Sequence, residues 1–429
     1  MENIIISSSE LYQLEHWLQL NELQTRAIYL LAFFLLLALL AVVVSKKYSL
    51  PIVVGYVLFG ILISPDILGL LPFLESEFHH WYEFLVFKLD YITQIALAFI
   101  VFTIGSELSI RTFKRLGKNI YIIALVEALA AVIVSTLAVY LIGVPLYAAI
   151  LLGAIAAASA PASTVMVLKE YNAEGPLSST LMAVVGLDNT LALIIFGLLS
   201  PLAVLMIEGG GVILSIDVLV IPFLEIIAAA GLGLGIGYAA QHYISYVDDK
   251  TKKVISIITA VVLSSALSLF FGLSSLISNL AVGFSIRNFA EKNLQISEYL
   301  DTLTIPLYAM FFIFAGAEIR FSQMASSTFI YTALVFLAAR ILAKVGGAYL
   351  AGRLTDASIN VKKYIGMGLI PQGGVAIALA FSVQKHFPQV PETALMIFNL
   401  VILTAAITEI FGPLLTKEAL IRSGEAELD

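Results

Sequence analysis

The sequence predicts an all-α polytopic membrane protein, on the evidence of its composition and of the length of its apolar runs. Of 429 residues, 60% are hydrophobic and only 12% are charged, and the mean hydropathy is +1.00. A soluble chain carries about 25% charged residues, so half that share indicates that most of the surface faces lipid. The chain has no cysteine, which excludes disulfides and thiolate metal sites.

Thirteen runs are candidates for transmembrane helices, because about 20 mostly apolar residues span a bilayer. The runs are 26–44, 50–65, 92–110, 119–141, 146–167, 178–200, 217–242, 254–272, 274–290, 303–319, 329–350, 363–384 and 393–415. Polar clusters at 45–51 and 248–253 are typical of the segments between them. The sequence therefore predicts thirteen transmembrane helices.

Lys and Arg are distributed unevenly between the two sets of loops that thirteen spans create. The side that includes the C-terminus holds 17 of them and the opposite side holds 4, while Arg340 and Lys344 lie inside a span. Basic residues accumulate in cytoplasmic loops. We therefore expect a multi-pass protein of the inner (plasma) membrane, with the N-terminus outside and the C-terminus in the cytoplasm.

An internal repeat is indicated by three pairs of residues that recur at a spacing of 210 or 211. The pairs are Glu107 and Glu318, Pro161 and Pro371, and Asn189 and Asn399. A duplicated unit of five helices, with two linking helices between the copies, would place the second copy upside down. Inverted repeats are typical of secondary transporters. The alternative is chance similarity between apolar helices.

Two prolines lie in the middle of predicted spans, Pro161 in AAASAPASTVMVL and Pro371 in GMGLIPQGGVAIA. Proline in a helix interior removes a backbone hydrogen bond. Freed backbone is tolerated at membrane depth only against protein or a wet cavity. A pair of broken helices in matching halves therefore predicts a binding site near the midplane, although a simple kink is the alternative. Small and polar residues surround the breaks: Ser159, Ser163, Thr164, Gln372, Gly373 and Gly374.

Charged residues inside the spans are the remaining signal, because each costs about 2.5–3.5 kcal/mol at the bilayer centre. Asp188 lies near the middle of 178–200, and Lys344 lies in 329–350. The two are natural partners, and a carboxylate so placed can bind either a proton or a cation. Competition for one carboxylate would couple two ion fluxes. The alternative is a fixed salt bridge that only holds the helices together.

Further acids and bases in the spans have less defined roles. Glu127 and Arg340 are a candidate second pair, because their spans are equivalent in the proposed repeat, and here we favour a structural role. We assign no role to Glu225 or Glu409. His79 and His80 lie in an outer loop, where we expect them to be solvated side chains.

Several motifs in order give the chain a resemblance to a known family. They are LPIVVGYVLFGILISP, FIVFTIGSELSI, ASAPASTVMVLKEY, AVVGLDNTLAL and LIPQGGVAIALA. Over about residues 27–415 the chain resembles the monovalent cation:proton antiporters, in the branch with bacterial sodium/proton exchangers and the membrane portions of potassium-efflux exchangers.

The resemblance implies a homodimer in which a core domain with crossed broken helices moves, elevator-like, against a dimerisation domain. The implied divisions are 1–112 for the N-terminal part of the dimerisation domain, 113–200 for the first half of the core, 201–250 for a linker helix, 251–325 for the second part of the dimerisation domain, 326–416 for the second half of the core, and 417–429 for a cytoplasmic tail.

The resemblance also implies roles for individual residues. Asp188 falls on the first position of the family's acidic pair and would bind the monovalent cation, and Lys344 falls on the intramembrane lysine that pairs with it. Thr164 falls near the polar residues of the broken helix that line the ion site, and Ser159 and Ser163 flank it as further candidates. The transported cation and proton are substrates, and we predict neither a resident cofactor nor a nucleic-acid partner.

Asn189 departs from the family pattern, because the second position of the pair is normally an aspartate that carries the proton. An amide oxygen can coordinate a cation but the group cannot release a proton near neutral pH. Three readings are open: an engineered replacement, a natural residue with Asp188 as the lone proton carrier, or a protein that has lost exchange.

The sequence therefore predicts an antiporter of Na⁺ (or Li⁺ or K⁺) and H⁺. The alternatives are a sodium-coupled symporter of an organic anion and a non-transporting ion-binding membrane protein. No P-loop, nucleophile–base set or metal-ligand cluster is evident, so we expect neither ATP-driven transport nor an enzyme.

Overall fold

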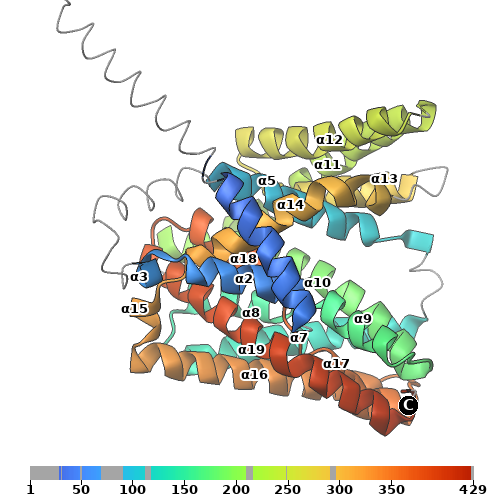
Figure 1. Ribbon diagram of the computed structural model, residues 1–429, viewed down its shortest axis with the longest axis vertical. Coiled ribbons are helices and arrows are strands. Elements are labelled where there is room, and N and C mark those ends of the chain that lie inside the picture. Colours follow the sequence, from blue (N-terminus) through green and yellow to red (C-terminus); the bar gives the residue numbers. More distant parts are fainter. Residues whose placement is uncertain are drawn as a thin grey trace, which may run out of the picture.

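The computed structural model describes residues 29, 31–48, 51–68, 90–111, 117–208, 216–247, 249–289 and 296–426. Every regular element in these ranges is a helix (Figure 1). His79 and His80 lie outside the described residues, so their expected place in a loop stays a prediction.

The described chain opens with a helix over 31–47. The helices that follow are α2 (Ile52–Leu62), α3 (Pro65–Leu68), α5 (Asp90–Glu107), α7 (Lys118–Leu141), α8 (Leu146–Ala156), α9 (Pro161–Glu170), α10 (Pro176–Glu208), α11 (Ile216–Tyr246), α12 (Lys250–Phe270), α13 (Ser275–Phe289), α14 (Ile296–Ala317), α15 (Phe321–Met324), α16 (Ser327–Arg353), α17 (Ile359–Gly368), α18 (Gly374–His386) and α19 (Pro391–Ser423).

Local sequence explains where several helices begin and end. The Asp249 carboxylate accepts a hydrogen bond from the Thr251 amide at 2.9 Å and caps α12, and Ser326 caps α16 in the same way. Pro391 is suited to the first turn of α19 because no intrahelical N–H is needed there. Gly143 follows α7 with φ 97°, a left-handed conformation that favours glycine, and lets the chain turn into α8.

The helices agree in position with the predicted apolar runs, and two of the runs are each occupied by a pair of shorter helices, α8–α9 and α17–α18. Among the described residues, seven helical segments are long and apolar enough to cross a membrane, with Leu146–Glu170 counted as one. Large apolar side chains are strongly exposed, including Leu141 at 80% and Phe270 at 80%, as lipid contact requires. These findings confirm an all-helical membrane protein, while the number of thirteen crossings stays a prediction.

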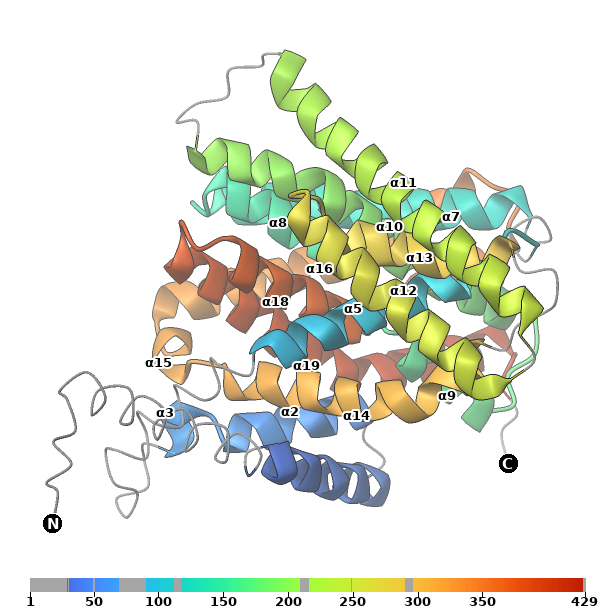
Figure 2. The ribbon, with the colours of Figure 1, turned by 90° about the horizontal axis from the view of Figure 1, so that it is seen from above.

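The helices form two groups that lie side by side. In one group α16 packs along α7, and α8, α10, α17 and α19 contact this pair, while α9 and α18 pack against those helices. In the other group α13 packs against α5 and α11, α14 packs against α2 and α5, and α12 covers α11. Figure 1 shows α11, α12 and α13 on the side of the molecule opposite α16, α17 and α19, and Figure 2 shows the same bundle from above.

Close backbone contacts hold the second group together. A Cβ added to Gly60 of α2 would lie 2.1 Å from the Ile313 carbonyl oxygen of α14, and one added to Gly105 of α5 would lie 2.1 Å from the Leu280 carbonyl oxygen of α13. Only glycine permits these approaches. Small residues at helix contacts are the usual means by which membrane helices pack closely.

Candidate ion-binding site

Two interrupted helices meet at their breaks. Residues 157–160 separate α8 from α9, and residues 369–373 separate α17 from α18. The amide of Ala160 donates a hydrogen bond to the carbonyl oxygen of Pro371 at 2.8 Å, so the two breaks are in direct contact. Two helix C-termini and two helix N-termini therefore converge in the interior, and each carries unpaired backbone groups and a partial charge.

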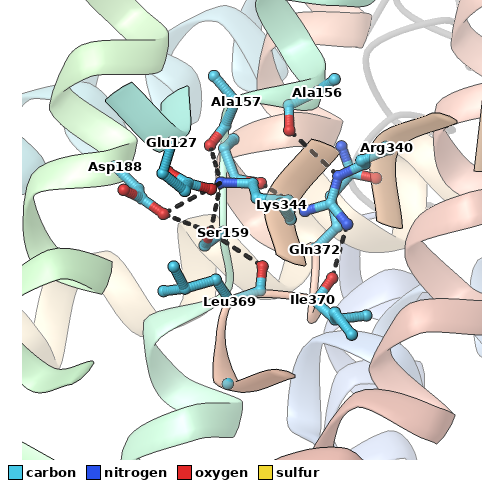
Figure 3. Close-up of polar contacts among 12 residues, drawn as sticks. Glu127, Ala156, Ala157, Ser159, Asp188, Arg340, Lys344, Leu369, Ile370 and Gln372 are labelled. Atoms are coloured by element: carbon cyan, nitrogen blue, oxygen red, sulfur yellow. Dashed lines mark hydrogen bonds and ion pairs between the residues drawn. The ribbon is translucent and has the colours of Figure 1, made fainter. Parts of the chain in front are cut away.

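Arg340 of α16 supplies donors to the carbonyl ends. Its Nε donates to the Ala156 carbonyl at 3.2 Å, its Nη2 to Ala158 at 2.8 Å and its Nη1 to Ile370 at 2.6 Å (Figure 3). The side chain is fully buried. A guanidinium has five donors in a fixed fork, and this allows one residue to satisfy carbonyls from both broken helices.

Polar side chains of the breaks satisfy further carbonyls. Thr164 Oγ1 donates to Gly368 at 2.9 Å, and Gln372 Nε2 donates to Ile155 at 3.2 Å. Both side chains therefore donate to the carbonyl ends of the broken helices. Gly374 has a different reason to lack a side chain, because an added Cβ would lie 2.8 Å from the Phe312 ring.

Lys344, one turn beyond Arg340 on α16, contacts two carboxylates at once. Its Nζ lies 2.5 Å from Glu127 Oε1 of α7 and 3.1 Å from Asp188 Oδ2 of α10 (Figure 3). It also donates to the Ala157 carbonyl at 2.6 Å and to Ser159 Oγ at 3.0 Å. All three charged side chains are fully buried. If all three are ionised, this cluster has one surplus negative charge.

The pairing of Glu127 with Arg340 that the repeat suggested is wrong, because Lys344 is the cation at ion-pair distance from Glu127. The reason is that the donors of Arg340 are occupied by three carbonyl oxygens. The pairing of Asp188 with Lys344 agrees with the sequence interpretation.

Several oxygen atoms around the cluster have no hydrogen-bond partner among the described residues. They belong to Asp188 (Oδ1), Glu127 (Oε2), Asn189 (Oδ1) and Thr190 (Oγ1). Ser159 Oγ donates to the other oxygen of Asp188 at 2.7 Å. Buried acceptors are normally satisfied, so unsatisfied ones beside a buried carboxylate are suited to hold a proton or an ion.

Glu409 of α19 is a residue to which the sequence assigned no role. It is 5% exposed, and its Oε2 accepts a hydrogen bond from Ser163 Oγ. Ser163 is the third residue of α9, and a Cβ added to Gly373, just before α18, would lie 2.8 Å from Glu409 Oε1. The carboxylate therefore lies against the N-terminal ends of both broken helices. The only sequence signal was a lone acid in an apolar span, with no spacing that connects it to the breaks.

Helix N-termini compensate only part of the cost of burying this carboxylate. Each contributes about 0.3–1 kcal/mol to a nearby negative charge, whereas burial of an ionised carboxylate costs several kcal/mol. Among the described residues, no Lys, Arg or His lies at ion-pair distance from Glu409. A bound proton or cation would supply the remaining compensation.

The fold and these buried charges can be set beside known proteins. The transmembrane family "Sodium/hydrogen exchanger" matches residues 33–421. This chain belongs to the sodium/hydrogen exchanger family. The predicted resemblance is thereby confirmed at the level of the family.

Individual exchanger relatives are distant but similar over most of their length. The chain is 23% identical to the probable Na⁺/H⁺ antiporter GerT of Bacillus cereus, over 82% of this chain and 88% of GerT. It is 25% identical to a Na⁺/H⁺ antiporter of Enterococcus hirae, over 78% and 84%. The solved structure of the sodium proton antiporter MjNhaP1 of Methanocaldococcus jannaschii at pH 8 has a TM-score of 0.71 and 19% identity, over 93% of this chain and 99% of that one. This last similarity establishes a shared fold.

Proposed function

We propose that this exchanger-family chain is a secondary active antiporter that exchanges Na⁺ for H⁺. The observation that carries the proposal is the position of Lys344 between Glu127 and Asp188, with all three side chains fully buried. Two carboxylates and one ammonium have a surplus negative charge, which one monovalent cation or one proton neutralises. Because either ion can do so, each displaces the other, and that competition couples the two fluxes.

The choice of ions is supported by the relatives described above, a probable Na⁺/H⁺ antiporter and a Na⁺/H⁺ antiporter. Competition for a carboxylate does not require Na⁺ in particular, so Li⁺ and K⁺ belong to the proposal. A symporter of an organic anion is less suited to this site, because the two buried cations are already engaged, Lys344 by two carboxylates and Arg340 by carbonyl oxygens.

Asp188 is the proposed cation ligand, with Ser159 and the amide oxygen of Asn189 as neutral ligands. Asp188 Oδ1 and Asn189 Oδ1 are both without a hydrogen-bond partner among the described residues. Glu127 then supplies the second acid that Asn189 does not. We therefore propose that Asn189 is a natural residue of an exchanging protein. Thr164 could join the site only by leaving its present carbonyl partner.

We further propose alternating access by an elevator-type motion within a homodimer. The core would comprise 113–200 and 326–416, the dimerisation domain 1–112 and 251–325, with 201–250 as a linker and 417–429 as the tail. Support comes from the two helix groups described above. The proposed repeat is supported by a shared spacing. Helix α5 ends at Glu107 and α14 ends at Ala317, 210 residues later, and the two prolines have the same spacing. The distribution of Lys and Arg supports a plasma-membrane protein with a cytoplasmic C-terminus.

Reconstitution into liposomes tests the proposal. With a preset pH gradient, addition of Na⁺ should collapse the gradient, and Li⁺ and K⁺ should be compared at equal ionic strength. Asp188→Ala should abolish the response, and Glu174→Gln, an exposed acid, should keep it. Failure of the parent protein to respond to any of these cations would refute the proposal, and a fully active Asp188→Ala would refute the site.

A further inference from the structure

A groove between α11 and α12 lies apart from the broken helices, and α12 forms an edge of the bundle (Figure 1). Its volume is ≈ 510 Å³, within the range of sites that hold small molecules. Ile236, Ala240, Ile255 and Leu263 make its walls mostly apolar. Of the seven long apolar segments in the described part of the chain, these two helices bury the smallest share of their residues. The groove therefore faces the lipid.

One end of the groove is polar and positively charged. Lys252 lies in the first turn of α12 and is exposed, and Ser256 follows one turn later on the same face. Tyr243, in the last turn of α11, lines the groove with them and is 51% exposed. Among the residues that the structure describes, no acidic side chain lies at ion-pair distance from Lys252. This end therefore offers a cation without a counter-charge.

The length of the groove matches one leaflet of a bilayer. Lys252 and Leu263 line its two ends and are 11 residues apart on α12, a rise of about 16 Å at about 1.5 Å per residue. Half of a hydrocarbon core of about 30 Å is about 15 Å. With the Lys252 ammonium at the level of the headgroups, the apolar part of the groove reaches about the midplane. Lysine and tyrosine are both typical of that interface.

We propose that this groove binds an anionic phospholipid, with the phosphate on Lys252 and one acyl chain between α11 and α12. The hydroxyls of Ser256 and Tyr243 are donors for the phosphate and ester oxygens at the same end. A zwitterionic headgroup would bring a second cation to Lys252, so a headgroup with net negative charge is favoured. Lys252 belongs to the loops that are rich in Lys and Arg, which places the lipid in the leaflet predicted to be cytoplasmic. The site uses no residue of the Lys344 cluster and is independent of exchange.

Lipid-dependent unfolding of the purified protein in detergent tests the headgroup contact. Phosphatidylglycerol should raise the unfolding temperature of the parent, because a ligand that binds the folded state stabilises it. Phosphatidylcholine with the same chains should do so less, and inorganic phosphate should have no effect. Lys252→Gln should raise the half-maximal concentration of phosphatidylglycerol about fivefold or more, and Lys252→Arg should keep the parental value. Lys118→Gln, which changes an exposed lysine at the start of α7, is the matched control.

A second variant tests the acyl-chain contact. Thr259 is exposed and lines the groove about halfway along, so Thr259→Trp should obstruct the chain and weaken the response to both phospholipids. Leu269→Trp places the same side chain on the exposed surface of α12 outside the groove and should leave the response unchanged. Gel filtration should show that each variant is folded, and either variant alone gives a reading.

Three results would overturn the lipid site. One is equal stabilisation by phosphatidylglycerol and phosphatidylcholine, and another is stabilisation by inorganic phosphate as strong as by phosphatidylglycerol. The third is a parental response in folded Lys252→Gln and Thr259→Trp proteins. If these two variants instead reduce the molecular mass measured by light scattering at every lipid concentration, a second copy of the chain covers the groove and the lipid assignment is wrong.

Discussion

The amide of Ala160 donates to the carbonyl of Pro371 at 2.8 Å, which joins the two interrupted helices at their breaks. Neither break can shift without changing this bond and the carbonyl contacts of Arg340 on both helices. The two breaks are therefore linked directly and through Arg340. The acids that contact Lys344 and Ser163 lie around the breaks, on α7, α10 and α19.

Arg340 is expected to be structural rather than a transport ligand. Arg340→Ala leaves buried carbonyls of both broken helices without donors and should destabilise the protein by about 3 kcal/mol or more. Arg340→Lys should recover only part of the loss, because an ammonium cannot reproduce the guanidinium fork. Thermal unfolding in detergent measures both. Arg353→Ala, an exposed arginine on the same helix, should change stability by at most about 0.5 kcal/mol.

Glu127 is expected to be essential for exchange. Glu127→Gln leaves one acid and one lysine, so the cluster is neutral without a bound ion and has no surplus charge to attract a cation. The rate at which Na⁺ collapses a pH gradient should fall at least about tenfold. Gel filtration should show that the variant is still folded. Parental rates in Glu127→Gln would mean that the contact with Lys344 only joins α7 to α16.

Asn189→Asp is expected to add a proton-carrying acid beside Asp188. The surplus negative charge of the cluster then rises by one, so cation affinity should increase and the cycle should carry more charge. Exchange measured at imposed membrane potentials should become more voltage-dependent than in the parent. Asn189→Ser, which removes the amide without adding a charge, is the control. Loss of exchange in Asn189→Asp would argue that the amide itself is required.

Glu318 and Lys385 form an ion pair at 3.2 Å between the end of α14 and α18, one from each helix group. Both side chains are largely buried, at 8% and 15% exposure. Removal of one partner should therefore reduce the stability by about 1–3 kcal/mol. This is more than an exposed ion pair contributes. The exchanged pair Glu318→Lys with Lys385→Glu should recover part of the stability. A thermal double-mutant cycle measures the coupling, and zero coupling would show that the pair does not join the two groups.

The sequence by itself determined the helical membrane class, the positions of the breaks, and Asp188 and Lys344 as partners. These features are readable because the length of an apolar run, a proline within it and an isolated charge are local properties whose cost is set by the bilayer. The repeat spacing added that the two breaks belong together.

Only the tertiary structure decided which acid contacts which cation. Glu127 pairs with Lys344 rather than with Arg340, and Ser163 turns to Glu409 rather than to Asp188. Sequence spacing gives a residue's face on its own helix, but not the depth and rotation of that helix against its neighbours. The depth and rotation of a helix are set by packing and by the need of buried carbonyls at the breaks for a hydrogen-bond donor. Arg340 supplies such donors to three backbone carbonyls and is therefore not the partner of Glu127.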